Sequence, residues 1–444
     1  MKHAYLLYTG YGKTKLMLDK IMSYPIKPRV LLISTKSIVE SSWQSEIDKW
    51  YPGQISYSYI TGRIPMKQRL EIINKPVDIL ALNTNMIEWY IENTTDIKAI
   101  KHLKGGTKTY YNTDQLVNRF NMIIIDESSL FKNYSSNRFK ALKNWCSKIK
   151  DVFILSATPT PKNIEDLWSQ IYLLDGGTRL EKTITNFRNL YGTPIPMFNG
   201  CTRYEYSQQA VDYILSLVQD IVTSVPEPPQ ALFPEPIIRK IMISPDAKTN
   251  ELLNNFKNDY IVQLDGHTIK AYTKNQLMIK ISQIASGHLY TREYGKDITL
   301  HVNDIKFKAL QHMLSTINTP VLILYTYVTD KEKLLTLPGA VLLDNAEAFN
   351  DWNANKIKIG ILSPFSVAHG INLQYSDCEN IIWFSPIWDT EKWQQTNARV
   401  CRRGQTRQVL IRVLILRNTF DDYAFNLVQE KFTFQYNNLK RLSW

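Results

Sequence analysis

Short apolar runs alternate with longer amphipathic stretches along the first 175 or so residues of the chain. Each apolar run is followed by a polar or glycine-containing turn and then by a segment with helical periodicity. This order predicts parallel strands that are covered by helices on both faces of a sheet. The runs predicted as strands are His3–Tyr8, Arg29–Ser34, Asp78–Leu82, Asn121–Ile125 and Val152–Leu155.

The same alternation resumes near residue 303 and continues to the C-terminus. It predicts a final helix at Thr419–Lys440 and strands at Val321–Tyr325, Ala340–Leu343, Lys358–Leu362, Asn380–Phe384 and Gln408–Leu416. Between the two α/β regions, five prolines fall within residues 226–236, which a helix could not pass through. Helical patterns at 208–223, 245–265 and 275–289 surround them. We therefore expect an α/β fold of two lobes, 1–235 and 236–444, with a helical linker at about 245–300.

Composition limits the class of protein. At 444 residues the chain is about three times a typical domain, and no apolar run approaches the ~20 residues that span a bilayer. Its four cysteines are scattered, as expected of reduced thiols in the cytoplasm. The net charge of +12 favours a polyanionic partner such as nucleic acid, although a solvated basic surface is the alternative.

The first chemical motif is Gly10-Tyr11-Gly12-Lys13-Thr14, which follows a predicted strand and opens a predicted helix. Glycines let backbone N–H groups approach phosphate, and a helix N-terminus favours negative charge. We expect Lys13 to reach the β- and γ-phosphates of a nucleotide and Thr14 to bind Mg²⁺. Because Leu7 stands where the full phosphate-loop pattern has another glycine, an ordinary strand–helix turn is the alternative.

The second motif is an apolar strand, Met122–Ile125, that ends in Asp126 and Glu127. Asp126 is the candidate for the Mg²⁺ shell, and Glu127 is the candidate to polarise an attacking water. Acidic pairs also end strands at plain sheet edges. The pair is more informative here because it follows a phosphate loop in the same lobe.

The ordered motifs resemble those of superfamily-2 helicases. Gly10–Thr14, Asp126–Ser129 (Asp-Glu-Ser-Ser) and Leu155–Pro159 resemble motifs I, II and III. Residues 31–50, 79–84, 321–327 and 363–373 resemble motifs Ia, Ib, IV and V, and residues 395–407 are similar to motif VI of the Snf2-like group. The narrower resemblance is to compact Snf2-like members carried by bacteriophages, and it covers residues 8 to about 415.

The resemblance implies two RecA-like lobes that use ATP and Mg²⁺. Lobe one would bind the nucleotide through Gly10, Gly12, Lys13, Thr14 and Asp126, with Glu127 as the catalytic carboxylate. Lobe two would supply Arg399 and Arg402 as arginine fingers, with Gln395 lining the interface. We expect the spacing of three to place both guanidinium groups on one helical face.

Further roles follow from the same resemblance. The residues expected to couple nucleotide state to the strand-binding surface are Ser156, Thr158, Gly370 and Asn372. The candidates for contact with nucleic-acid backbone are Thr35, Lys36, Asn83, Thr84, Thr326 and Ser363, although polar residues at strand ends are often only caps or turns. Two aromatic-rich stretches, Thr107–Tyr111 and Phe187–Tyr206, are candidates to stack on unpaired bases, with packing against the lobe as the alternative.

The leading functional hypothesis is an ATP-dependent DNA helicase or translocase that remodels branched or forked DNA in replication, recombination or repair. One alternative is a double-stranded DNA translocase that hydrolyses ATP without separating strands. Another, from a different class, is a nucleic-acid-binding module with an inactive ATPase site. An RNA helicase fits motif VI less well. Since one chain carries both halves of the site, we expect that a monomer suffices, working without a membrane in the cytoplasm, which is that of the host if a phage encodes it.

Overall fold

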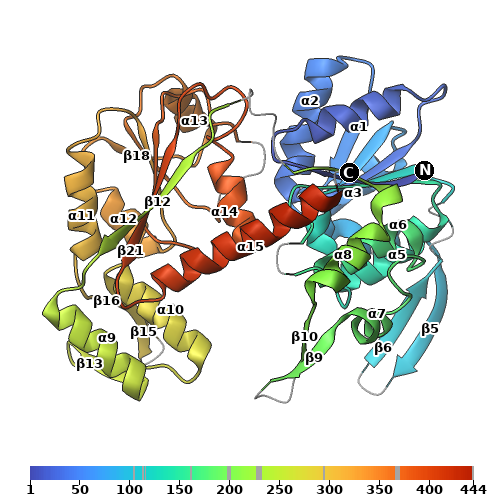
Figure 1. Cartoon of the computed structure of the whole chain (residues 1–444). Coiled ribbons are helices and arrows are strands. Elements are labelled where there is room, and N and C mark those ends of the chain that lie inside the picture. Colours follow the sequence, from blue (N-terminus) through green and yellow to red (C-terminus); the bar gives the residue numbers. More distant parts are fainter. Residues whose placement is uncertain are drawn as a thin grey trace. The chain divides into compact units, whose positions relative to one another are not determined.

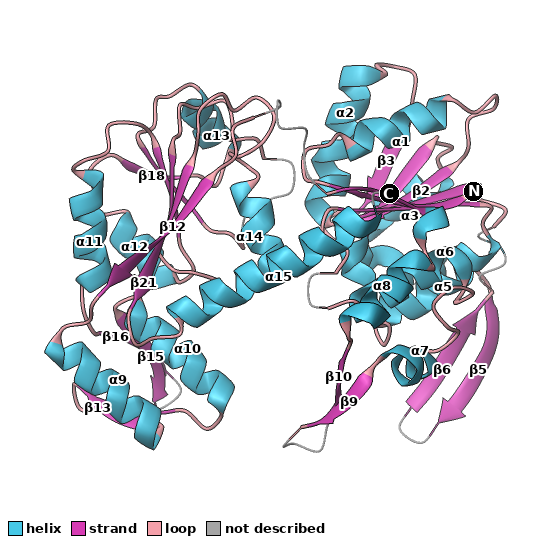
Figure 2. Ribbon diagram, in the orientation of Figure 1, coloured by secondary structure: helices cyan, strands magenta, loops and turns pink. Residues whose placement is uncertain are grey.

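The computed structural model describes residues 1–103, 106–112, 115, 117–160, 163–197, 202–226, 233–293, 296–365 and 371–442 (Figure 1). The chain divides into two compact units. Unit 1 comprises Met1–Pro228 with Thr433–Trp444, and unit 2 comprises Pro229–Phe432. Each unit is an α/β lobe built on its own parallel sheet (Figure 2).

Unit 1 is built on a seven-stranded sheet in the order β11-β1-β8-β7-β2-β4-β3, in which every neighbouring pair is parallel. The strands are β1 (Lys2–Leu7), β2 (Val30–Ser34), β3 (Tyr57–Ile60), β4 (Ile79–Asn83), β7 (Met122–Asp126), β8 (Asp151–Ser156) and β11 (Val222–Val225). Parallel strands need crossover connections, and helices supply them here. They are α1 (Lys13–Met22), α2 (Trp43–Trp50), α3 (Met66–Asn74), α4 (Ile87–Thr94), α5 (Asn137–Lys148), α6 (Glu165–Asp175), α7 (Ile184–Tyr191) and α8 (Gln208–Ser216).

The two faces of this sheet carry separate apolar cores. In β7, Met122 and Ile124 belong to the core that α1 and α2 cover, whereas Ile123 and Ile125 belong to the core of α4, α5 and α6. Successive strand residues point to opposite faces, so a strand covered on both sides must be apolar throughout. All five residues of β7 are buried, which explains why the central strands could be predicted as uninterrupted apolar runs.

Two antiparallel hairpins extend unit 1: β5 (Ile97–Leu103) with β6 (Gly106–Tyr111), and β9 (Thr193–Pro196) with β10 (Thr202–Glu205). The aromatic stretch Thr107–Tyr111 lies in β6, and its side chains are outside the described part of the structure. In the second stretch, Phe187 is fully buried, and the Tyr206 hydroxyl donates to Glu165 Oε2 at 2.9 Å. The ends of that stretch therefore pack against the lobe, as the alternative predicted.

Unit 2 is built on a six-stranded parallel sheet in the order β12-β21-β20-β17-β19-β18. The strands are β12 (Ile237–Ile243), β17 (Val321–Leu324), β18 (Ala340–Leu342), β19 (Ile359–Leu362), β20 (Asn380–Trp383) and β21 (Leu410–Leu416). The helices that accompany them are α11 (Ile305–Leu314), α12 (Val328–Leu334), α13 (Ala346–Asn353) and α14 (Thr390–Asn397). The second α/β alternation thus forms a second lobe, as predicted.

Residues 247–301 form a helical insertion after β12, with an apolar core of its own around Leu253, Phe256 and Ile281. It contains α9 (Ala247–Asp259), β13 (Ile261–Leu264), β14 (His267–Lys270), α10 (Lys274–Ala285), β15 (His288–Glu293) and β16 (Lys296–His301). The expected helices are present but shorter, and each is followed by a hairpin that the sequence analysis missed. The helix expected over 208–223 is likewise wrong beyond Ser216, because Val222–Val225 pairs with β1 as strand β11.

The last helix, α15 (Asp421–Leu442), contributes to the core of each unit. In unit 2, Asp421 pairs with the buried ammonium of Lys306 at 2.5 Å. In unit 1, Leu439 and Leu442 are buried, and Ser224 Oγ donates to the Leu439 carbonyl at 2.8 Å. α15 is 22 residues long but charged, and no helix among the described residues is long and apolar enough to cross a bilayer.

Gly360 tests the packing of unit 2. A Cβ at this position of β19 would lie 2.7 Å from Trp352 Cζ3 and 2.8 Å from Leu343 Cδ1, and the Trp352 ring is fully buried. We expect Gly360→Ala to lower the free energy of unfolding of unit 2 by about 1–3 kcal/mol through overpacking. Denaturant unfolding measures this. The control is Gly62→Ala, where the nearest atom, Met86 Sδ, is 4.0 Å away; equal midpoints for the two variants would contradict the packing described.

Candidate functional site

The phosphate-loop candidate joins β1 to α1. Gly10 and Gly12 have φ angles of 90° and 96°, a left-handed conformation that glycine adopts at no steric cost. Gly12 caps α1, and nothing lies within 4 Å of the position that its Cβ would take. Lys13 Nζ donates to the carbonyls of Leu7 and Tyr8 at 3.1 and 3.3 Å, so the ammonium group lies over the loop. The motif therefore has the open backbone and the cation that bind phosphate.

Asp126 lies at the carboxyl end of β7 and is buried. Its Oδ2 accepts a hydrogen bond from the indole Nε1 of Trp43 at 3.0 Å, and its carbonyl accepts one from Ser34 Oγ at 2.9 Å. Burial raises the pKa of Asp126, while the Trp43 hydrogen bond and the charge of Lys13 oppose that rise. A buried carboxylate beside an ammonium group is a ready ligand for a cation, because a bound cation offsets its lost hydration.

Glu127 follows in a strained backbone conformation, with φ 62° and ψ 60°. Left-handed backbone in a residue other than glycine costs of order 1–3 kcal/mol and clusters at functional sites. The next residue, Ser128, donates to Gln170 Oε1 at 2.6 Å, and Gln170 Nε2 donates to the Pro159 carbonyl at 2.6 Å. Gln170, on α6, thus joins the acidic motif to the motif that follows β8.

The coupling candidates Ser156 and Thr158 lie at the end of β8. Ser156 Oγ accepts a hydrogen bond from the Thr158 backbone N–H at 3.0 Å, which fixes the turn. The Thr158 hydroxyl is buried and has no hydrogen-bond partner in the described part of the chain. Gln435 on α15 donates to the Ala157 carbonyl at 3.0 Å. The turn between the two candidates is therefore held by groups from distant parts of the sequence.

The candidate nucleic-acid contacts of unit 1 gather at one edge of the sheet. β2 and β4 are neighbours with Ser34 opposite Asn83, so Thr35 and Thr84 follow adjacent strand ends. Lys36 Nζ lies 4.0 Å from Glu40 Oε1. The Thr35 hydroxyl and Asn83 Oδ1 are buried without a hydrogen-bond partner among the described residues. The structure brings these four positions together beside Asp126, whose strand β7 also neighbours β2.

The arginine motif of unit 2 lies beyond α14, which ends at Asn397. The prediction that one helical face carries Arg399 and Arg402 is wrong. The Arg399 carbonyl accepts from the Leu373 backbone N–H at 3.0 Å, and Gly404 has a φ of 103°, so the backbone continues in turns. Arg399 is buried, whereas Arg402 is partly exposed and its Nη1 donates to Asn372 Oδ1 at 2.9 Å. A predicted coupling residue and a predicted arginine finger are thus in direct contact.

The other predicted positions of unit 2 have local partners. Gln395 is buried on α14 and its Nε2 donates to Glu391 Oε1 at 3.2 Å. The Thr326 hydroxyl donates to the Ser385 carbonyl at 3.3 Å, and Ser363 Oγ accepts from the Phe365 backbone at 3.3 Å. Thr326 and Ser363 follow neighbouring strands, β17 and β19. Gly370 lies outside the described residues.

Trp43 and Gln170 are functional candidates that sequence reasoning missed. Trp43 is 83 residues from Asp126 and Gln170 is 42 residues from Ser128, so local spacing contains no sign of either contact. Buried tryptophan and glutamine side chains usually direct their polar atoms at a partner, so their burial, seen only in the structure, is the signal that points to these contacts.

The residues present fit a Mg²⁺–nucleotide complex. The glycine-rich loop is open, Lys13 supplies positive charge, Thr14 lies in the first turn of α1, and Asp126 is a buried carboxylate beside that charge. Hydroxyl and carboxylate oxygens are the protein ligands that Mg²⁺ prefers, with water and phosphate oxygens completing the shell. Thr14 and Asp126 are the residues that would hold the ion.

A phosphate loop and an acidic strand on one parallel-sheet lobe, with an arginine motif on a second such lobe, define a nucleotide hydrolase of the superfamily-2 helicase class. Residues 8–309 match the SNF2-related domain. The chain belongs to this family and is a DNA-dependent ATP hydrolase.

Relatives extend the comparison. The chain is 28% identical over 435 residues to "Putative protein p41" of Acyrthosiphon pisum secondary endosymbiont phage 1, covering 93% of this chain and 89% of that protein. It is 22% identical over 418 residues to the "DNA annealing helicase and endonuclease ZRANB3" of Bos taurus, covering 90% of this chain and 36% of that protein. The chain thus spans about a third of ZRANB3. Among solved structures, the "Sulfolobus solfataricus SWI2/SNF2 ATPase core in complex with dsDNA" covers 98% of this chain and 88% of that one, with 18% identity and a TM-score of 0.39.

The Trp43–Asp126 hydrogen bond can be tested by substitution. Trp43→Phe keeps an aromatic ring in the core but removes the donor to Oδ2. Groups that orient a metal ligand typically contribute 10–100-fold to metal affinity or activity. We therefore expect the Mg²⁺ concentration for half-maximal ATP hydrolysis to rise about tenfold, measured by Mg²⁺ titration at saturating ATP. Trp50→Phe is the control, because Trp50 is exposed and its indole donates to Glu46, away from Asp126; the same Mg²⁺ dependence in both variants would exclude a role for the Trp43 donor.

Proposed function

We propose that the chain is an ATP-driven DNA motor that remodels branched or forked DNA in replication, recombination or repair. One observation carries the proposal. The phosphate loop and the candidate DNA contacts Thr35 and Thr84 follow strands of a single parallel sheet, and Asp126 ends another strand of it, so all of them lie at its carboxyl edge. Open α/β sheets bind ligands at this edge. Events at the nucleotide therefore lie close to a surface suited to a DNA backbone.

The hydrolytic step rests on positioning and electrostatics. Lys13 and the N-terminus of α1 bind the phosphates, and bound Mg²⁺ would neutralise charge on the phosphate oxygens. Glu127 orients the attacking water and accepts its proton. We assign Arg399 and Arg402 the role of stabilising the negative charge that develops on the γ-phosphate. Arginines in this role can raise the hydrolysis rate about 10³–10⁵-fold.

Coupling of hydrolysis to DNA follows from the contacts around Glu127. Ser128 is tied through Gln170 to the turn after β8, so a shift of the acidic motif is transmitted to Ser156 and Thr158. ATP favours the state in which the groups on both lobes contact it, and hydrolysis removes that difference in affinity. The two units then bind the DNA backbone in alternation, which gives stepping that is indifferent to base sequence. The residues that bind are Thr35, Lys36, Asn83 and Thr84 in unit 1 and Thr326 and Ser363 in unit 2.

A motor that remodels DNA is supported by the name of ZRANB3, a DNA annealing helicase. A double-stranded DNA translocase that does not separate strands is the second candidate, and the name of the solved ATPase core bound to dsDNA keeps it open. A binding module without ATPase activity is disfavoured, because Lys13, Asp126, Glu127, Arg399 and Arg402 are all present. One chain contains both sets of residues, so we propose that a monomer in the cytoplasm suffices.

ATP hydrolysis measured without DNA and with single strands, linear duplex or a four-way junction tests the proposal. We expect the junction to stimulate the rate most and to release a labelled strand. Lys13→Ala should lower the stimulated rate roughly 10²–10³-fold by removing a preorganised charge from the phosphates. Stimulation should also fall steeply as salt rises, since phosphate contacts release counterions.

The matched control is Lys15→Ala, because Lys15 also lies on α1 but pairs with Asp19 instead of the loop. It should keep the wild-type rate. Equal stimulation by duplex and junction without strand release would favour the translocase. Failure to hydrolyse ATP with any DNA would exclude a motor.

A further inference from the structure

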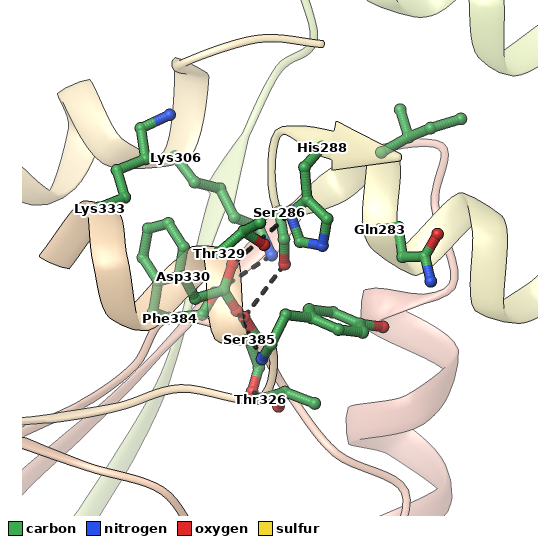
Figure 3. Close-up of polar contacts among 12 residues, drawn as sticks. Gln283, Ser286, His288, Lys306, Thr326, Thr329, Asp330, Lys333, Phe384 and Ser385 are labelled. Atoms are coloured by element: carbon green, nitrogen blue, oxygen red, sulfur yellow. Dashed lines mark hydrogen bonds and ion pairs between the residues drawn. The ribbon is translucent and has the colours of Figure 1, made fainter. Parts of the chain in front are cut away.

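A buried polar cluster in unit 2 joins the helical insertion to the lobe. We call it the Asp330 cluster: Ser286 and His288 from the insertion, Thr326 and Asp330 around the start of α12, and Ser385 after β20. Figure 3 shows Ser286 and His288 directed toward Asp330 and Ser385. The strands β17 and β20 that lead into it are neighbours, so the cluster lies at the carboxyl edge of the second sheet.

Asp330 is the centre of this cluster, and its side chain is 1% exposed. Oδ2 accepts from Ser385 Oγ at 2.5 Å and from the Tyr327 backbone N–H at 3.2 Å. Burial raises the pKa of Asp330 to about 6, and hydrogen bonds from Ser385 and from the backbone of Tyr327 and Thr326 oppose that rise. The ionised carboxylate thus holds the backbone of the turn that carries Thr326, in the manner of a helix cap.

Ser385 extends this chain of contacts in two directions. Its carbonyl accepts from the Thr326 hydroxyl at 3.3 Å, so side chain and backbone of residue 385 together link Asp330 to Thr326. Its hydroxyl also lies 3.0 Å from Ser286 Oγ, at the end of α10 in the insertion. One buried serine therefore connects the insertion, the capping carboxylate and a candidate DNA contact.

On its insertion side the cluster contains a buried imidazole, that of His288. His288 is buried between the rings of Tyr290 and Tyr327, at centroid distances of 4.8 and 4.9 Å. Its Nδ1 lies 3.8 Å from Asp330 Oδ1, and its Nε2 is buried without a hydrogen-bond partner in the described part of the chain. Burial lowers the pKa of His288 to about 4, so the ring is neutral at neutral pH. Buried polar groups are costly, and their directional bonds specify one arrangement of the parts they join.

We infer that Asp330 and Ser385 are positioning residues for the grip of unit 2 on DNA, and that they hold the Thr326 turn in register with the helical insertion. The inference rests on the proposed function, because Thr326 is a DNA contact only if the chain binds DNA. Neither residue touches nucleotide or DNA in this role. They act through Thr326, so their loss lowers the affinity for DNA and leaves the rate of ATP hydrolysis without DNA unchanged.

Ser385→Ala tests the inference in the full chain. We expect the concentration of duplex DNA for half-maximal ATPase stimulation to rise about threefold to tenfold, because the hydroxyl that bonds to Asp330 and Ser286 is lost. The DNA-free rate and the KM for ATP should not change. Asp330→Asn is the conservative variant, and it should stay near wild type because the amide oxygen can accept the same two hydrogen bonds. Ser376→Ala is the control, since Ser376 is also buried in unit 2 and makes a single bond to a backbone carbonyl.

A double-mutant cycle separates positioning from a general loss of stability. Thr326→Val alone should also raise the half-saturating DNA concentration, and Ser385→Ala should add nothing to it, because both changes remove one chain of contacts. Additive effects, or unchanged half-saturation in Ser385→Ala or Thr326→Val, would overturn the inference. If Ser385→Ala does not fold by near-ultraviolet circular dichroism, Asp330→Leu, which removes the acceptor at similar size, is judged by the same criteria. Wild-type protein without DNA stimulation would instead contradict the proposed function itself.

Discussion

A carboxylate at the end of a fully apolar strand is the constraint around which the nucleotide half-site of unit 1 is arranged. β7 must be apolar on both faces because helices cover both sides of the sheet, yet it ends in Asp126, which is buried. An isolated buried charge costs far more than the lobe could tolerate. The Trp43 indole donates to the carboxylate and the positive charge of Lys13 acts on it, and a bound cation would offset the remainder. The same arrangement that stabilises the strand end without ligand makes it a candidate site for Mg²⁺ and phosphate.

A second buried carboxylate, that of Asp330, lies at the carboxyl edge of the second sheet and is stabilised by different partners. Asp330 is buried like Asp126, but its hydrogen-bond donors are Ser385 and the Tyr327 backbone N–H, and the charge of Lys306 also acts on it. Among the described residues of unit 2, no phosphate loop accompanies it. A carboxylate oxygen that accepts from both Ser385 and the backbone of the turn, as Asp330 Oδ2 does, is suited to fix that turn. By contrast, Asp126 lies beside an ammonium group and an open loop, where a ligand can bind.

Burial on both faces decided how much of the fold could be predicted. Central strands such as Met122–Asp126 and Leu410–Leu416 are apolar at nearly every position, and the predicted runs end within a few residues of the observed ones. The edge strand Ile237–Ile243 was missed because Arg239 and Lys240 interrupt its apolar residues, as an exposed edge permits. Motif residues of the candidate site could be predicted from local spacing. Their orienting partners, Trp43 and Gln170, could not, since those contacts join residues 83 and 42 positions apart.

The division between apolar cores and polar strand ends also indicates which contacts can change during a cycle. Each lobe has apolar cores of its own, as the insertion does, and such cores are close-packed and resist rearrangement. The links between motifs are instead single hydrogen bonds, such as Gln170 to Pro159, Arg402 to Asn372 and Thr326 to Ser385. Each contributes only about 0.5–1.5 kcal/mol net, so a modest difference in nucleotide affinity suffices to exchange one for another. Directional bonds at the sheet edges can therefore respond to ATP while the lobes that carry them remain rigid.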